Sequence, residues 1–267
     1  MSYLDQLENN SIYIIREAYN QFKHMGLLWS IGKDSTTLLW LCRKAFFGKI
    51  PFPVMHIDTT FKFPEMYAYR DKYEKEWDLN LIIETNKDAI EKGINYKDND
   101  AFTCCHELKT VALQQAIVKH GFDALCVGIR RDEHSIRAKE RVFSSRSIDF
   151  KWDYKNQSAE MWDHYKGDTN EGKHVRIHPL LQWTELDIWK YIQRENIPIN
   201  ELYFAKNGKR YRSLGCMPIT IPIDSNADTV EKIVEELKTT DIAERSGRAQ
   251  DKETAYMMQK LRSLGYM

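Results

Sequence analysis

The sequence contains no apolar run near the roughly 20 residues that a membrane-spanning helix needs, so we expect no membrane association. Residues 1–5 show no basic segment followed by an apolar stretch, so we expect no signal peptide and a cytoplasmic location. The chain also has no excess of charge of either sign, because 39 Lys and Arg residues balance 39 Asp and Glu residues. Without a broad basic field, an extended nucleic acid is not an expected partner.

Cysteine is scarce, with five residues, and none of them forms a C-x-x-C pair. An odd number in a reducing compartment argues against a disulfide framework, and the missing pair argues against a structural zinc site. The metal-binding pattern H-E-x-x-H is absent. The Walker pattern G-x-x-x-x-G-K-[ST] is absent as well, so transfer of a γ-phosphate is not implied.

What the chain does contain is an alternation of short apolar runs and longer helical patterns. The apolar runs that predict strands are 26–29, 54–57, 79–83 and 124–128. The patterns that predict helices between them are 38–45, 64–77 and 108–120. This alternation predicts an α/β fold with a doubly wound, mostly parallel sheet, followed by an irregular C-terminal lobe. In such sheets ligands bind beyond the carboxyl ends of the strands.

No linker or internal repeat separates two independent domains. We expect residues 1–176 to form a nucleotide-binding α/β domain, in which segment 130–176 covers the substrate. Residues 177–267 are expected to form a helical lobe and a charged tail that is not an independent domain. Within this lobe, Thr184 is followed three residues later by Asp187, which is typical of a helix N-terminus.

The turn after the first predicted strand has the pattern S-x-G-K-D-S at residues 30–35. Its backbone N–H groups and the following helix N-terminus can bind an anion, and the hydroxyls of Ser30 and Ser35 can donate to phosphate oxygens. Gly32 allows close approach and Lys33 supplies a positive charge. Asp34 fits beside phosphates only with a bridging cation, so we assign it to Mg²⁺. The alternative is an ordinary polar turn.

This pattern resembles the pyrophosphate-binding loop of PP-loop ATP pyrophosphatases, which are adenine nucleotide alpha hydrolase-like proteins. Other segments are similar to the branch with sulfate adenylyltransferase small subunits and PAPS reductases. In chain order these segments are 58–66, 128–133, 137–141, 178–185, 212–216 and 244–248. The resemblance therefore covers nearly the whole chain.

The resemblance implies that ATP is split between its α- and β-phosphates and that AMP passes to an acceptor oxygen, most simply of sulfate. Mg²⁺ and Lys33 would then neutralise the departing pyrophosphate. The adenylyl sulfate anhydride is strongly uphill, and the family couples its formation to GTP hydrolysis in a large subunit. This chain has no Walker loop, so such a GTPase would be a separate partner.

Basic residues after the fourth predicted strand fit the same reaction, because they follow a strand end where a crevice is expected. Arg130 and Arg131 are the candidate catalytic cations, since guanidinium groups bind oxyanions in a bidentate manner. The candidate substrate-binding residues are Arg137, Lys139 and Arg141. The alternative is a solvated basic face. Asp58, at the end of the second strand, would bind the ribose or adenine, or cap the next turn.

The pair Cys104-Cys105 supports a second hypothesis, because thiols near a helix N-terminus and Lys109 tend towards the thiolate. Some PP-loop enzymes adenylylate a carbonyl oxygen and then replace it with sulfur. In such a thiolation of a nucleobase or nucleotide, Cys105 would carry sulfur from a donor, assisted by Cys104 or Cys216. The alternative is that these cysteines are small buried hydrophobes, as we expect for Cys42 and Cys126.

Three further hypotheses are an iron–sulfur cluster site, a reductase and a non-catalytic subunit. An iron–sulfur cluster on Cys104, Cys105 and Cys216 is conceivable but not expected, because the fourth ligand of a reductase cluster is missing after Cys216. The chain also lacks the cysteine near its end that such reductases use. A non-catalytic nucleotide-binding subunit would predict damage in the loop 30–35, which is intact. The sequence leaves open whether the chain forms a homodimer.

Overall fold

A six-stranded sheet forms the centre of the computed structural model, which describes residues 1–152, 157, 159–162, 164–165, 174–240, 244, 260–261 and 264. The strands are β1 (Met25–Leu28), β2 (Val54–Ile57), β3 (Leu81–Glu84), β4 (Ala124–Val127), β5 (Phe143–Arg146) and β6 (His174–Ile177). Their order is β3-β2-β1-β4-β6-β5, and all neighbours are parallel except the antiparallel pair β5 and β6. The predicted α/β fold with a mostly parallel, doubly wound sheet is confirmed.

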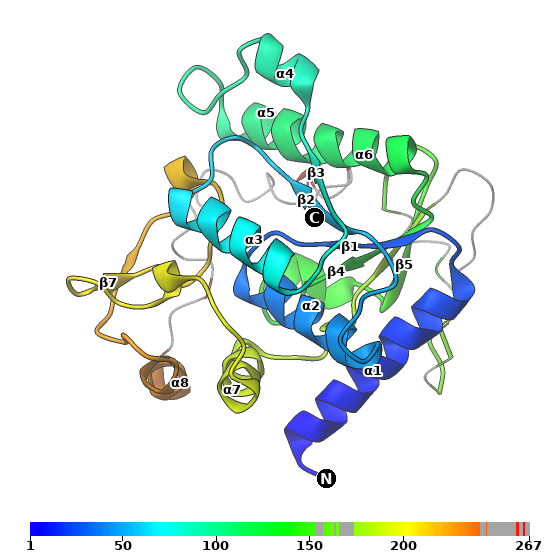
Figure 1. The fold of residues 1–267 in the computed structure, drawn as a ribbon. Helices are drawn as coiled ribbons and strands as arrows, with labels where there is room; N and C mark the ends of the chain where they lie inside the picture. The colour runs from blue at the N-terminus through cyan, green and yellow to red at the C-terminus, as the bar shows by residue number, and fades with distance from the viewer. Residues whose placement is uncertain are drawn as a thin grey trace.

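Helices cover both faces of the sheet (Figure 1). The longer ones are α1 (Tyr3–Gln21), α2 (Lys33–Ala45), α3 (Pro64–Glu76), α6 (Ala112–His120), α7 (Glu185–Glu195) and α8 (Val230–Thr239). Two short helices, α4 (Lys87–Glu91) and α5 (Ala101–Cys105), lead into a π-helical segment, η1 (His106–Val111), and so into α6. Figure 1 shows α5 and α6 on one side of the sheet and α1, α2 and α7 on the other.

Burial explains the central strands. Every residue of β1, β2 and β4 is buried, which is expected of parallel strands covered on both faces and agrees with their sequences, apolar except for His56 in β2. Two of the helices, α1 and α7, begin at N-terminal caps that can be recognised in the sequence. Ser2 and Asp5 form a capping box at α1, and Thr184 and Asp187 form the same arrangement at α7. Among the described residues, no helix is long and apolar enough to cross a membrane.

Strands β5 and β6 lie in or at the end of segment 130–176, in which the sequence analysis predicted no strand. Their burial conceals polar side chains: His174 and Arg176 of β6 and Arg146 of β5 are all at most 3% exposed. Such residues break the apolar pattern by which strands are recognised, so the sequence did not indicate them. The proposed domain boundary after residue 176 falls inside β6. That division of the chain remains a prediction, and most of the charged tail lies outside the described residues.

Candidate active site

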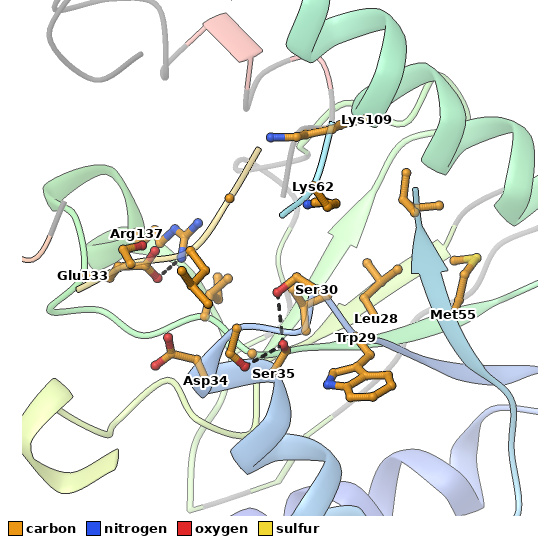
Figure 2. A pocket seen from close by; sticks show the side chains of 18 of the residues that line it. Leu28, Trp29, Ser30, Asp34, Ser35, Met55, Lys62, Lys109, Glu133 and Arg137 are labelled. Atoms are coloured by element: carbon orange, nitrogen blue, oxygen red, sulfur yellow. Dashed lines mark hydrogen bonds and ion pairs between the residues drawn. The ribbon is translucent and has the colours of Figure 1, made fainter. Parts of the chain in front are cut away.

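A cavity opens at the carboxyl ends of β1, β2 and β4, where the strand order reverses between β1 and β4. Its lining combines the phosphate-binding loop with residues from distant segments (Figure 2). From the loop come Ser30, Gly32, Asp34 and Ser35, and from elsewhere Met55, Ile57, Lys62, Lys109, Gly128, Glu133, Arg137, Tyr203 and Gly215. The structure therefore brings together residues that the sequence separates by more than a hundred positions.

The loop holds its hydroxyl groups at the cavity. Ser30 Oγ lies 3.0 Å from Ser35 Oγ, and Ser35 Oγ also donates to the carbonyl of Gly32 at 3.1 Å. Gly32 is the N-cap of α2, so the positive end of a 13-residue helix points at this place. The backbone N–H of Lys33 donates to Tyr203 Oη at 2.8 Å, which ties the loop to the C-terminal lobe. An anion at the loop would meet hydroxyls and a helix N-terminus together.

The backbone is strained at two strand ends that border the cavity. Ile31, after β1, has φ 65°, and Thr60, after β2, has φ 63°. Both side chains are β-branched, and this left-handed conformation is an outlier for such residues. Strain of this kind persists where the surrounding structure holds it and is concentrated at functional sites.

Gly128 lets α2 approach the end of β4. A Cβ atom placed on Gly128 would lie 3.0 Å from the backbone of Asp34 and of Ser35. Real Cβ contacts are rarely that short, so a larger residue would displace the phosphate-binding loop. The glycine thus sets how closely β4 packs against the start of α2.

Beneath the loop, four charged side chains form a closed ring of alternating sign. Asp34 accepts from Lys33 Nζ at 3.2 Å and from Arg130 Nε at 2.6 Å. Glu244 pairs with the same two cations from the other side. Lys33 is 1% exposed and Arg130 is fully buried. The ring joins the phosphate-binding loop, the end of β4 and the distal part of the chain.

The ring keeps its members charged. Burial alone would raise the pKa of Glu244, but Arg130 and Lys33 hold that pKa well below its usual range. Burial alone would lower the pKa of Lys33, but Asp34 and Glu244 raise it above its usual value. The sequence had shown Glu244 only as part of segment 244–248, with no role, and the other four residues of that segment lie outside the described part of the chain.

The network continues away from the cavity. Arg130 Nη1 donates to Asp132 Oδ1 at 2.5 Å, and Asp132 Oδ2 accepts the backbone N–H of Glu185, at the start of α7, at 2.8 Å. Glu185 in turn pairs with Arg212 Nη2 at 2.7 Å. Carboxylates therefore surround Arg130, so its guanidinium stands behind the loop rather than free in the cavity.

The remaining predicted site residues lie in different places. Arg137 is buried, pairs with Glu133, and lines the cavity together with it. Arg131 Nη2 donates to the carbonyl of Glu140 at 3.3 Å, whereas Lys139 is exposed.

Arg141 is half-buried, and neither it nor Lys139 is among the residues that line the cavity. Asp58 accepts from the backbone N–H of Thr60 and from Tyr67 Oη, each at 2.8 Å. This is the turn-capping arrangement that was one of its two predicted roles.

Two lysines that the sequence analysis did not expect at the nucleotide site border the cavity. Lys62 is 9% exposed and Lys109 is 8% exposed. Figure 2 shows them across the cavity from Ser30 and Ser35. Lys62 lies within segment 58–66, which carried part of the resemblance, and that was the signal that could have found it. Lys109 owes its position to the π-helical segment η1, a kind of irregularity frequent at functional sites.

The cysteines separate into two groups. Cys42 and Cys126 are fully buried in the core, in the environment expected for small hydrophobes. Cys104, Cys105 and Cys216 line a second cavity of about 290 Å³, which also includes Lys109 in its wall. Lys109 thus borders both cavities. Within the described residues, no group of three or more His, Cys, Asp or Glu side chains has the geometry to hold a metal ion.

Sequence similarity defines the class of protein. Residues 24–222 match the family model described as the phosphoadenosine phosphosulfate reductase domain. The matched residues include all six strands of the main sheet and the phosphate-binding loop.

Along its full length the chain is 44% identical to sulfate adenylyltransferase subunit 2 of Pseudomonas fluorescens (strain SBW25), covering 100% of this chain and 98% of the relative. The identity and coverage are the same for the subunit 2 of Pseudomonas putida (strain GB-1). The chain belongs to the sulfate adenylyltransferase subunit 2 family, and the predicted resemblance is confirmed.

Solved structures agree on the fold. Phosphoadenylyl-sulfate reductase from Candida auris, as a phosphate complex, gives a TM-score of 0.58 at 20% identity and covers 83% of this chain and 98% of its own. Candida glabrata FMN adenylyltransferase with ATP gives a TM-score of 0.60 at 18% identity and covers 92% and 87%. At these identities the likeness establishes the shared α/β architecture.

Proposed function

We propose that this chain transfers AMP from ATP to an oxygen of sulfate, which gives adenylyl sulfate and releases pyrophosphate. The observation that carries the proposal is the cavity at the switch point of the sheet. There, Ser30, Ser35 and the N-terminus of α2 form a phosphate site in a chain whose full-length relatives are named sulfate adenylyltransferase subunit 2. An ATP-using adenylyltransferase is also the activity that the loop pattern predicted.

The phosphate end of the cavity suits a triphosphate and a hard cation. Ser30 and Ser35 donate to phosphate oxygens, while Gly32 leaves the backbone open to close approach. Asp34 lines the cavity with a carboxylate, which is the ligand type that Mg²⁺ prefers, so the residues present fit the ion. Mg²⁺ bound there would neutralise charge on the departing pyrophosphate. Lys33 and Arg130 hold Asp34 in place through the ring and add positive potential behind the loop.

The acceptor end of the cavity is cationic. Lys62 and Lys109 stand opposite the loop, and Arg137 lines the same cavity beside Glu133. Sulfate held between the two lysines would present an oxygen towards a nucleotide bound at the loop, as in-line attack on the α-phosphorus requires. We propose Lys62 and Lys109 as the principal sulfate-binding residues. The predicted catalytic role of Arg131 and the predicted substrate-binding roles of Lys139 and Arg141 remain proposals, and none of the three residues lines the cavity.

The proposed reaction also needs a source of energy. The anhydride of adenylyl sulfate is strongly uphill, and the chain has no Walker pattern of its own. We therefore propose that it works with a separate GTPase large subunit, in agreement with the designation "subunit 2" of its relatives.

One observation favours a second candidate function, ATP-dependent thiolation. Cys105 lines a cavity that meets the nucleotide cavity at Lys109, so a sulfur carried there would lie close to an adenylylated acceptor. On this hypothesis an external sulfur donor loads Cys105, and a nucleobase or nucleotide carbonyl replaces sulfate as acceptor.

Pyrophosphate release from Mg-ATP, with mass spectrometry of the products, separates the two candidates. One reaction contains sulfate, with and without a GTPase subunit, and the other contains nucleotides with a persulfide source. Adenylyl sulfate in the first supports the proposed function, whereas a product in which sulfur replaces oxygen, lost in Cys105→Ser, supports thiolation. Lys33→Ala and Asp34→Ala should abolish pyrophosphate release with either acceptor. Near-normal release by folded variants would contradict the assignment of the loop.

A further inference from the structure

Three thiols line the second cavity. Its volume is about 290 Å³, whereas one water occupies roughly 30 Å³ in the liquid. Molecules about as small as water therefore fit inside. Cys104 and Cys105 reach it from α5, and Cys216 reaches it from the loop that precedes the 3₁₀ turn η4 (Met217–Ile219). Two adjacent cysteines and a third one more than a hundred positions later thus share one space outside the nucleotide cavity.

Cys216 is held in place from several sides. Its Sγ lies 3.2 Å from Thr59 Oγ1, and its carbonyl accepts from Thr220 Oγ1 at 2.8 Å. The next residue, Met217, donates its backbone N–H to the carbonyl of Phe61 at 2.7 Å. The sulfur atom therefore has a defined position between the loop after β2 and the wall of the second cavity.

The charges around Cys216 favour its thiolate. Burial alone would raise the pKa of this thiol, but the ammonium groups of Lys109 and Lys62 and the Thr59 hydroxyl bring it down to about 7. Cys104 lies in the same cavity but has the opposite shift: burial and the neighbouring Cys105 and Cys216 raise its pKa to about 11. Of the two thiols in this cavity, Cys216 is therefore the more readily ionised.

We propose that Cys216 is a peroxide-reactive thiol and that Cys104 is its resolving thiol. The Cys216 thiolate attacks one oxygen of hydrogen peroxide; an S–O bond forms, the O–O bond breaks, and the hydroxide released takes up a proton as water. The Cys104 sulfur then displaces the hydroxyl of the sulfenic acid, which leaves as a second water, and an S–S bond forms. Two electrons pass from the two sulfurs to one peroxide.

Oxidation of Cys216 changes the nucleotide cavity, because the walls of the two cavities are connected. Gly215, the neighbour of Cys216, lines that cavity, and Lys109 lines both. Oxidation removes the negative sulfur beside Lys109 and Lys62 and links the loop at 215–216 covalently to α5. Adenylyl transfer by the oxidised protein therefore slows, and a thiol reductant restores it.

Intact mass and peptide mapping of the full chain test the proposal, with one equivalent of hydrogen peroxide as the oxidant. The expected product is about 2 Da lighter and contains a peptide linked through Cys104 and Cys216. In Cys104→Ser, a sulfenic acid trapped by dimedone should appear on Cys216. Cys42→Ser, a change in the core, serves as the matched control and should give the wild-type product. Linkage elsewhere, or oxidation confined to Cys104 or Cys105, would overturn the proposal.

A second variant tests the role of the charge beside Cys216 without removing its sulfur. Lys109→Met keeps the thiol but removes the cation that lowers its pKa most, so oxidation of Cys216 should slow about tenfold. An unchanged oxidation rate in folded Lys109→Met would also contradict the proposal. Because the readout is the mass of the chain, the result is independent of whether sulfate is the acceptor.

Discussion

Glu244 and Arg130 form an ion pair beneath the phosphate-binding loop although they are 114 positions apart in the chain. Both side chains are nearly inaccessible, at 6% and 0% exposure. The carboxylate also pairs with Lys33, so one residue from the distal part of the chain holds two cations of the candidate site. Removing one member of such a buried group leaves an uncompensated charge.

We expect Glu244→Gln to lower the free energy of unfolding by about 3 kcal/mol, because Lys33 and Arg130 would each lose a buried partner. Urea denaturation measures the change, and a double-mutant cycle with Arg130→Met measures the coupling. The control is Asp78→Asn in the exposed pair of Lys49 and Asp78, which should cost less than about 1 kcal/mol. A loss in Glu244→Gln as small as in the control would refute the importance of the ring.

Lys62→Met should weaken sulfate binding more than ATP binding, because the lysine stands across the cavity from the loop. A charge-assisted contact is worth about 1.5–3 kcal/mol, so the KM for sulfate should rise about tenfold or more. Initial rates of pyrophosphate release at varied sulfate and varied ATP measure both constants. Lys206→Met, at an exposed lysine, is the control. An equal rise in the KM for ATP would indicate that Lys62 binds the nucleotide rather than sulfate alone.

Gly128→Ala should damage both stability and activity. The new methyl group would meet the backbone of Asp34 and Ser35 at 3.0 Å, and overpacking of this kind costs about 1–3 kcal/mol. Thermal unfolding and pyrophosphate release report the two effects. In Gly93→Ala, where a Cβ meets nothing within 4 Å but φ is 74°, stability should fall while turnover per folded molecule stays the same. Full activity of Gly128→Ala would show that the loop tolerates displacement.

We expect the buried His56 side chain to lower the free energy of unfolding in mild acid. Burial, with the nearby Lys62 ammonium, lowers its pKa from an ordinary 6.5 to about 4, and its Nδ1 lies 2.8 Å from the carbonyl of Trp29. Between these two values the unfolded chain binds more protons, so the free energy of unfolding falls by at most about 1.4 kcal/mol per pH unit as pH decreases. This contribution to the slope fades as pH rises through 6.5 and is nearly absent about one pH unit higher.

The matched variant is His56→Asn, whose amide can donate to the same carbonyl and does not titrate in this range. Urea denaturation at several values between pH 4 and pH 7 should give a shallower dependence on pH for the variant than for the wild type. An identical dependence in the two proteins would exclude His56 as the source.

Local sequence was sufficient to predict the fold class, the central strands and the phosphate-binding loop. Strands β1, β2 and β4 are short apolar runs, and the loop 30–35 is a contiguous pattern, so each can be recognised without knowing its neighbours in space. The helix start at Thr184 was readable for the same reason, since its capping box involves residues three positions apart.

Contacts over long sequence distances decided the rest. Strands β5 and β6 hide charged side chains that only tertiary partners make tolerable, and the ring at Glu244 joins residues whose spacing carries no signal. Packing likewise brings Lys62 to the nucleotide cavity and Lys109 to the boundary between the two cavities. Backbone propensity acts between near neighbours, whereas the pairing of buried charges depends on which segments the sheet brings together, and that is a property of the whole fold.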